Sequence, residues 1–300
     1  MPLSRRELKN RVLRKMSART LQSILKFVED KEPRLWGLEK TSTFVTDSVL
    51  VSLFKDLFAV GYHSLFESVK KWLPTSSRSL RHNTKIIRHL LCKWGKKRVV
   101  LGTLKDWKEA ASYESFLKGL KGVCLWIDTT DLRLIGKASC SHTSEKWSFK
   151  CNSPGHRYAF LIDSTEQIRK VWGGYSPKIY DGSFLEFYAK WFEKALAGAE
   201  VIADVHFEWG TKNFKKVTFI TPIPEPRGRR KKDPEGKPIP KSLTKEQKAF
   251  SAHVHSVRSR VENTFGRLKH KIDALSKPWK DGEQQLDFIV WFAAGLLNSP

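Results

Sequence analysis

The chain has 300 residues, of which 40% are hydrophobic, so it can bury one full core and a smaller second one, which excludes a disordered chain. It carries 55 Lys and Arg against 31 Asp and Glu, and this formal charge of +24 is spread along its whole length. Such an excess predicts a polyanionic partner. The longest apolar run, 288–297, is about half of the roughly 20 residues that a membrane helix needs, so nucleic acid is favoured over a membrane.

The first residues and the cysteines indicate a reducing compartment. MPLSRRELKNRVLRK carries charge where a signal peptide has its apolar stretch, so we expect a soluble intracellular protein. The cysteines do not have the density of a disulfide scaffold, and we expect them to be reduced: Cys92, Cys124, Cys140 and Cys151.

Residues 1–44 are basic and helix-prone, and apolar residues at helical spacing occur only around Leu21 to Val28. We expect a basic N-terminal arm with one short helix. A clearer apolar stripe, Leu50 to Phe58, predicts a helix that ends at Gly61, where a left-handed residue is favoured. Ser64 and Glu67 have the spacing of a capping box, which predicts a second, short helix up to Pro74.

A third helix is predicted after the N-caps offered by residues 75–77, with one apolar and one basic face. The basic face holds residues three and four positions apart: Arg78, Arg81, His82, Lys85, Arg88 and His89. Three helices with a basic last helix follow the plan of a helix-turn-helix domain, here 45–95, whose recognition helix enters the DNA major groove. A solvated basic face on an ordinary helical bundle is the alternative.

After a basic connector, 96–121, the periodicity becomes that of strands, at 123–127, 158–162 and 201–203. An amphipathic helix is predicted from Phe184 to Leu196, and a long closing helix from Thr244 to Ile272. These elements predict a mixed α/β domain, 122–300, in which 222–242 is a Pro-rich, charged loop.

Three acidic residues are placed where this domain could bring them together. Asp128 directly follows the apolar run VCLWI, and Asp204 directly follows VIA, so each carboxylate should emerge at or near the end of a buried strand. Glu262 lies one position round from the apolar stripe of the closing helix. Each residue alone has an ordinary explanation as a turn former, a helix cap or the edge of an amphipathic helix.

The stretch HSVRSRVENTFGRLK, 255–269, resembles the R-x3-E-x6-K helix of DDE transposases, in particular the Harbinger-like group and its bacterial insertion-sequence relatives. WIDTTDLRL resembles the first-aspartate strand of that family, and VIADVHFEWG resembles the second. The resemblance covers about residues 122–298, with a weaker match of 49–91 to the helix-turn-helix that precedes the catalytic domain. The order of Asp128, Asp204 and Glu262 is its specific part.

This resemblance implies an RNase H-like catalytic domain and an endonuclease that cleaves and joins DNA strands. Asp128, Asp204 and Glu262 would then hold two divalent ions, Mg²⁺ or Mn²⁺, for which carboxylates are the preferred ligands. Arg258 and Lys269 would contact double-stranded DNA, the element ends and the target, near the cut. His156 and Asp181 match the family only loosely.

The sequence departs from the family pattern at Val205 and His206, after the second aspartate, and at His255, where the family has tyrosine. A domesticated, non-catalytic DNA-binding descendant is therefore the main alternative. A homodimer is possible. A eukaryotic host would place the protein in the nucleus, and any other host would place it in the cytoplasm. In a eukaryotic host, the basic residues 229–232 would be either a nuclear localisation signal or part of a solvated loop.

A zinc-stabilised module is a second alternative. Cys140, His142, Cys151 and His156 are spaced closely enough to chelate one ion. The same segments also resemble the strands of a hairpin, in which these side chains would not bind a metal ion.

Overall fold

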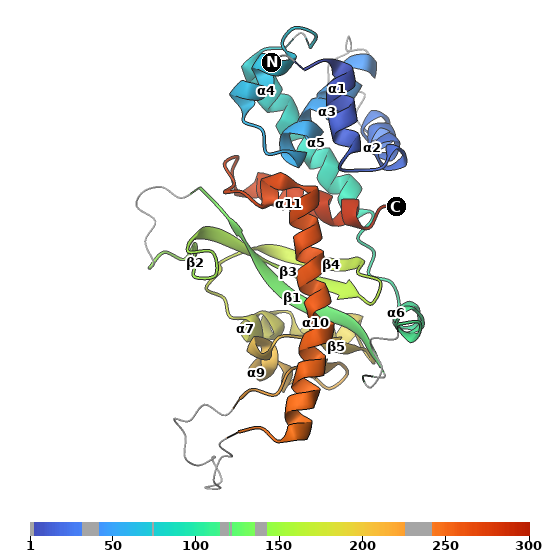
Figure 1. Ribbon diagram of the computed structural model, residues 1–300, viewed down its shortest axis with the longest axis vertical. Helices are drawn as coiled ribbons and strands as arrows, with labels where there is room; N and C mark the ends of the chain where they lie inside the picture. Colours follow the sequence, from blue (N-terminus) through green and yellow to red (C-terminus); the bar gives the residue numbers. More distant parts are fainter. Residues whose placement is uncertain are drawn as a thin grey trace.

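The computed structural model describes residues 3–31, 42–73, 75–114, 120, 122–135, 143–225 and 242–300. A helical part lies at one end of an elongated molecule and a part built on a β-sheet lies below it (Figure 1). The long helix α10 runs down one face of the sheet. The predicted mixed α/β class is therefore confirmed for the second half of the chain.

The helical part takes its helices from both ends of the chain: α1 (Arg5–Leu13), α2 (Ala18–Lys31), α3 (Ser42–Leu57), α4 (Tyr62–Val69), α5 (Ser77–Lys96) and α11 (Glu283–Leu297). Ser4 and Glu7 form a capping box that starts α1. Leu8, Leu21 and Ile24 are buried in the common core. The expected N-terminal arm is therefore wrong for its described residues, which form two packed helices.

The sheet contains β1 (Val123–Arg133), β2 (Trp147–Ser148), β3 (Ser153–Asp163), β4 (Ile168–Tyr175), β5 (Glu200–Ile202) and β6 (Thr218–Ile220). The strand order is β4-β3-β1-β5-β6, and β2 pairs with the first residues of β3. Neighbouring strands β4, β3 and β1 are antiparallel, whereas β1, β5 and β6 run parallel. The sheet is therefore mixed, with β1 at its centre.

Helices cover both faces of this sheet, which explains why its central strands, β1 and β3, are buried at nearly every position. Along β3, Tyr158 and Phe160 face the core shared with α10, while Ala159 and Leu161 face the opposite core. Phe160 meets Phe265 of α10 edge to face, with ring centroids 5.2 Å apart. The covering helices are α6 (Leu104–Ser112), α7 (Asp181–Phe187), α8 (Ala189–Ala195), α9 (Glu208–Thr211) and α10 (Lys245–Lys271), with 3-10 turns at Val205–Phe207 and Asp273–Leu275.

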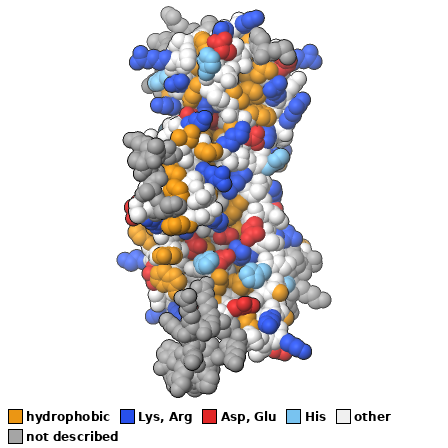
Figure 2. Space-filling view, turned by 60° about the vertical axis from the view of Figure 1, so that its left-hand side comes forward, with side chains coloured by type: hydrophobic (Ala, Val, Ile, Leu, Met, Phe, Trp, Pro, Cys, Tyr) orange, Lys and Arg blue, Asp and Glu red, His pale blue; other side chains and the backbone are white. Residues whose placement is uncertain are grey.

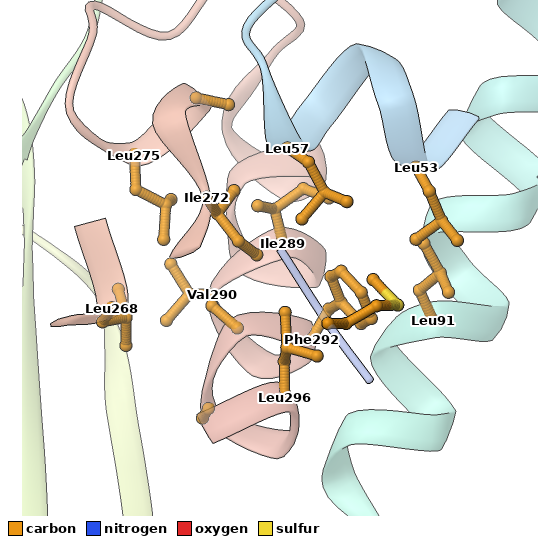
Figure 3. Close-up of a cluster of buried hydrophobic side chains, with 14 of the residues drawn as sticks. Leu53, Leu57, Leu91, Leu268, Ile272, Leu275, Ile289, Val290, Phe292 and Leu296 are labelled. Carbon is orange, nitrogen blue, oxygen red and sulfur yellow. The ribbon is translucent and has the colours of Figure 1, made fainter. Parts of the chain in front are cut away.

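One hydrophobic core joins the helical part to the sheet. Side chains of α3, α5, α10 and α11 meet in it (Figure 3). At the crossing of α5 and α11, Gly95 and Gly295 bring the two backbones so close that a Cβ on Gly95 would lie 2.2 Å from the carbonyl oxygen of Trp291. Residues 283–297, which we expected within the catalytic domain alone, therefore pack against the helical part.

The segment expected as a basic connector is also partly structured. It contains α6, which begins with a capping box between Thr103 and Asp106. Trp107 of this helix is buried in the core beneath the sheet, and its indole N–H donates to the carbonyl oxygen of Leu101 at 2.7 Å. Among the described residues, no helix combines the length and apolarity that would be needed to cross a bilayer.

Candidate active site

Asp128 lies in the middle of β1, not at its end as expected. The apolar run stops at Ile127, but the strand continues through polar residues to Arg133, and Asp128 pairs with Phe160 of β3. Its side chain is only 10% exposed, and one carboxylate oxygen accepts the backbone N–H of Thr129 at 2.7 Å. Burial raises the pKa of Asp128 to about 6, although that N–H and the nearby Arg258 both act to lower it.

Asp204 and Glu262 reach the same place from other elements. Asp204 follows β5 as predicted and caps the 3-10 turn at Val205–Phe207, where it accepts the backbone N–H of His206 at 3.1 Å. Glu262 projects from the middle of α10, which begins at the Thr244 cap as predicted and packs on the face of β1. Its side chain is 57% exposed, so it lies at the mouth of the site.

Arg258 brings the three carboxylates together. One guanidinium nitrogen lies 3.1 Å from Asp128 and 3.0 Å from Asp204, and the other lies 2.9 Å from Glu262, one turn further along α10. The three acids come from β1, from the turn that follows β5 and from α10, yet a single cation contacts all of them. The predicted convergence of the triad is therefore present in the structure.

The triad and Arg258 line an open cleft of about 1260 Å³. Acidic, basic and histidine side chains gather on this face of the molecule, with hydrophobic side chains beside them (Figure 2). The cleft is also lined by further cations and by aromatic residues: Phe149, Lys150, Arg157, Lys178, Tyr180, Trp209 and Lys269. A negatively charged centre is thus framed by positive charge.

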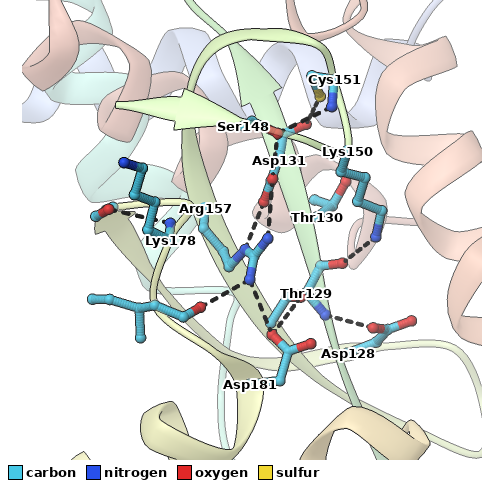
Figure 4. A network of polar contacts seen from close by, with 12 residues as sticks. Asp128, Thr129, Thr130, Asp131, Ser148, Lys150, Cys151, Arg157, Lys178 and Asp181 are labelled. Carbon is cyan, nitrogen blue, oxygen red and sulfur yellow. Dashed lines mark hydrogen bonds and ion pairs between the residues drawn. The ribbon is translucent and has the colours of Figure 1, made fainter. Parts of the chain in front are cut away.

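A polar network holds the strand beside Asp128 (Figure 4). The hydroxyl of Thr129 donates to Asp181 at 2.9 Å, and Arg157 of β3 binds Asp131 at 2.7 Å and Asp181 at 3.5 Å. Asp181 starts α7, and burial raises its pKa while Arg157 and Thr129 oppose that rise. Because every side chain in the network has a partner, β1 can carry consecutive polar residues in a buried strand.

The comparison with known protein families decides the assignment. The model of the DDE superfamily endonucleases matches residues 127–298, which is more than half of the chain. The chain belongs to this family. No curated protein and no solved structure matches it. The matched region of this DDE endonuclease begins within β1 and ends just after α11, so it contains all three members of the triad.

Membership of the family indicates a nuclease that acts on DNA, so the positions of the residues predicted to contact DNA can be compared with the cleft. Lys269 lies in the cleft, where its ammonium group donates to the Thr130 hydroxyl at 3.3 Å, and burial lowers its pKa. Arg258, also expected to contact phosphate, pairs instead with the triad. In the helical part of the endonuclease, Arg78, Arg81 and Lys85 lie exposed on α5, as expected.

Arg88 corrects the predicted basic face. Its side chain is fully buried, and its guanidinium binds Asp56 of α3 at 2.5 Å and Asp281 at 2.7 Å. Helical spacing placed Arg88 with the other basic residues, but these two acids draw it into the core. It joins α5 to α3 and to the segment before α11, so its side chain is not accessible to DNA.

The four residues considered for zinc are not all described. Cys140 and His142 lie outside the described residues. Cys151 donates its thiol to the carbonyl oxygen of Asp131 at 3.5 Å, and His156 lies 3.2 Å from Glu283. Within the described part of the chain, no group of three His, Cys, Asp or Glu side chains surrounds a common metal position; the three acids of the triad are instead spread over two nitrogens of Arg258.

Several residues that line the cleft were not predicted from the sequence. Thr129, Arg157 and Lys150 surround Asp128, yet only the first belongs to the WIDTTD run that was singled out. The consecutive polar residues of that run, inside a strand, were the signal that could have indicated a network. Trp209 is the second-last residue of the VIADVHFEWG segment, and its place in the cleft depends on contacts with α7, which the sequence does not reveal.

Proposed function

We propose that this DDE endonuclease is a transposase-type enzyme that cleaves and joins DNA phosphodiester bonds, with Asp128, Asp204 and Glu262 as ligands of two divalent ions, Mg²⁺ or Mn²⁺. The observation that carries the proposal is the meeting of these three carboxylates on one cation, Arg258, at 2.9 to 3.1 Å. Three acids from separate elements repel one another and remain together only where a cation holds them.

The donor set fits divalent metal ions. All three side chains offer carboxylate oxygens, the hard ligands that Mg²⁺ and Mn²⁺ prefer. The three carboxylates are spread over two guanidinium nitrogens, and the proposed ions would take the place of this cation and draw the carboxylates together. When bound, two such ions activate a water or a 3′-hydroxyl near neutral pH and stabilise charge on the leaving oxygen.

The protein's own residues position this chemistry. Thr129 holds the Asp128 carboxylate through its backbone N–H and holds Asp181 through its hydroxyl. Asp204 is fixed by its cap on the following 3-10 turn. Lys150 and Lys269 stand at the cleft as phosphate ligands, close to where the scissile bond would lie.

The strand order supports an RNase H-like domain, in which an antiparallel set of three strands is extended by two parallel strands. We place the DNA duplex along both parts of the molecule. The helix-turn-helix contacts to DNA would come from exposed basic residues of α5, namely Arg78, Arg81 and Lys85. Helices α3 and α4 pack against α5.

A nicking assay tests the proposal. The purified full chain is incubated with supercoiled plasmid carrying the element ends, in Mg²⁺ or Mn²⁺, and with Asp128→Asn and Glu262→Gln variants. Wild type should nick only with metal, and both variants should be inactive while they still bind DNA. Glu166→Gln is the matched control, since Glu166 pairs with Arg260 and Arg267 of the same helix, α10, but outside the cleft. A metal-dependent nick by Glu262→Gln would refute the triad.

A further inference from the structure

Three aromatic side chains stand exposed at the cleft, although apolar surface of this size is normally buried. Tyr180, just before α7, is 75% exposed, Trp209 of α9 is 46% exposed, and Phe149, just after β2, is 72% exposed. All three line the cleft that holds the triad. Neither the proposed metal chemistry nor the contacts to phosphate require them.

The neighbours of Trp209 fix the position of its indole ring but leave part of the ring exposed. The pyrrole edge of the indole lies directly on Gly182 of α7, where an added Cβ would come within 2.3 Å of Nε1 and Cε2. A Cβ on Gly210 would in turn lie 2.4 Å from the carbonyl oxygen of Gly182. Two glycines therefore let α7 and α9 approach closely and fix the indole against backbone, while nearly half of Trp209 stays exposed in the cleft.

Cations alternate with these aromatic residues. Lys150 follows Phe149 directly, and Lys178 lies two positions before Tyr180, all four at the rim of the same cleft. Alternating π-faces and positive charges match a single nucleic-acid strand, whose bases stack on aromatic rings while its phosphates meet lysines. A protein partner is a poorer match, because the centres of protein interfaces are depleted of lysine.

We propose that the aromatic residues Tyr180 and Trp209, with Phe149 in the same cleft, form a stacking site for an unpaired DNA base next to the scissile phosphate. In a duplex the base faces are covered by their neighbours and only their edges are accessible, so a ring can stack only on a base that has left the helix. This inference rests on the proposed function, since it assigns the strand at the cut a frayed or extruded nucleotide.

Binding of forked DNA tests the stacking site without any cleavage. The probe is a duplex with a short unpaired end that contains 2-aminopurine, whose fluorescence falls on stacking, mixed with the full chain and no divalent metal. We expect strong quenching with wild type and with Trp209→Phe, which keeps an aromatic face. Trp209→Ala and Tyr180→Ala should each lose most of the quenching and bind the forked end roughly tenfold more weakly, with unchanged affinity for blunt duplex.

Phe187→Ala is the matched control, because Phe187 is an exposed aromatic residue of α7 that does not line the cleft. Tyr180 is so exposed that its replacement leaves the core intact, and it keeps the test decisive if Trp209→Ala fails to fold. Full quenching by Tyr180→Ala and Trp209→Ala, or equal loss in Phe187→Ala, would overturn the stacking site. Quenching by a protein that never nicks DNA would refute the proposed function and leave the stacking site standing.

Discussion

Replacing Asp128 by asparagine should stabilise the metal-free protein at neutral pH, because the wild-type carboxylate is buried at a cost. Burial is the largest influence on this group and raises its pKa from the usual 3.8 to about 6, against the N–H of Thr129 and the charge of Arg258. The folded protein thus binds the proton more tightly than the unfolded chain does. This contribution to stability is complete below about pH 4 and is lost as the pH rises through 6.

The size of the effect follows from the two pKa values. At about 1.36 kcal/mol per pKa unit, an ionised Asp128 at pH 7 costs the folded state about 3 kcal/mol. Asparagine has nearly the same shape and no charge, so it avoids this cost. Arg258 keeps Asp204 and Glu262 as partners in the variant, at 3.0 and 2.9 Å, and is not left unpaired.

Urea unfolding of wild type and Asp128→Asn, followed at pH 7 and pH 4 in the presence of a chelator, measures this difference. The variant should be more stable by about 3 kcal/mol at pH 7 and by less than about 1 kcal/mol at pH 4. Asp204→Asn is the control: it removes a charge from the same guanidinium, but its side chain is more exposed than that of Asp128, so the gain should be smaller. An Asp128→Asn protein that is less stable at pH 7 would show that attraction to Arg258 outweighs burial, and would refute the reasoning.

The other predictions concern helix packing and the exposed basic residues of α5. Gly95→Ala should lower the unfolding free energy by about 3 kcal/mol, since its Cβ meets the Trp291 backbone, whereas Gly266→Ala, with open space on α10, should raise it by up to about 1 kcal/mol in the same urea titration. Arg88→Ala should cost about 3 to 5 kcal/mol, because the fully buried Asp56 would lose its two bonds to the guanidinium and keep only Lys55, at 3.6 Å. Arg81→Ala with Lys85→Ala should leave stability unchanged, weaken duplex binding and flatten its salt dependence; an unchanged slope in a fluorescence-anisotropy titration would contradict their role.

Elements whose signals are local could be predicted from the sequence. The closing helix begins at Thr244 because the capping box with Gln247 is formed, and the third helix begins after the Ser76 cap. The second aspartate was placed correctly because the apolar run before it forms a short strand, β5, which ends at Ile202, two positions before Asp204. The convergence of the triad followed from the order of its residues in a known family, which composition and periodicity alone do not supply.

Features that depend on distant residues were beyond the sequence. Arg88 is buried because Asp56 and Asp281, far away in the chain, meet it, and helical spacing cannot show this.

Gly61 was expected to end a helix in the left-handed conformation, but Ala59 adopts it with φ 51°, and Gly61 instead starts α4 with φ −67°. The predicted capping box at Ser64 is also wrong, because α4 has already begun at Tyr62.

The central claim is that Asp204 and its two partners bind the catalytic metal directly, and a change of ligand tests it most sharply. Asp204→Cys replaces a hard oxygen by a soft thiolate, which binds Mg²⁺ poorly and Mn²⁺ better, while Asp204→Ser is the control of similar size without a thiolate. In the plasmid nicking assay, Asp204→Cys should be inactive in Mg²⁺ and regain activity in Mn²⁺, and Asp204→Ser should be inactive in both. Equal rates for the two variants in Mn²⁺, or nicking by wild type in excess chelator, would contradict metal binding by this residue.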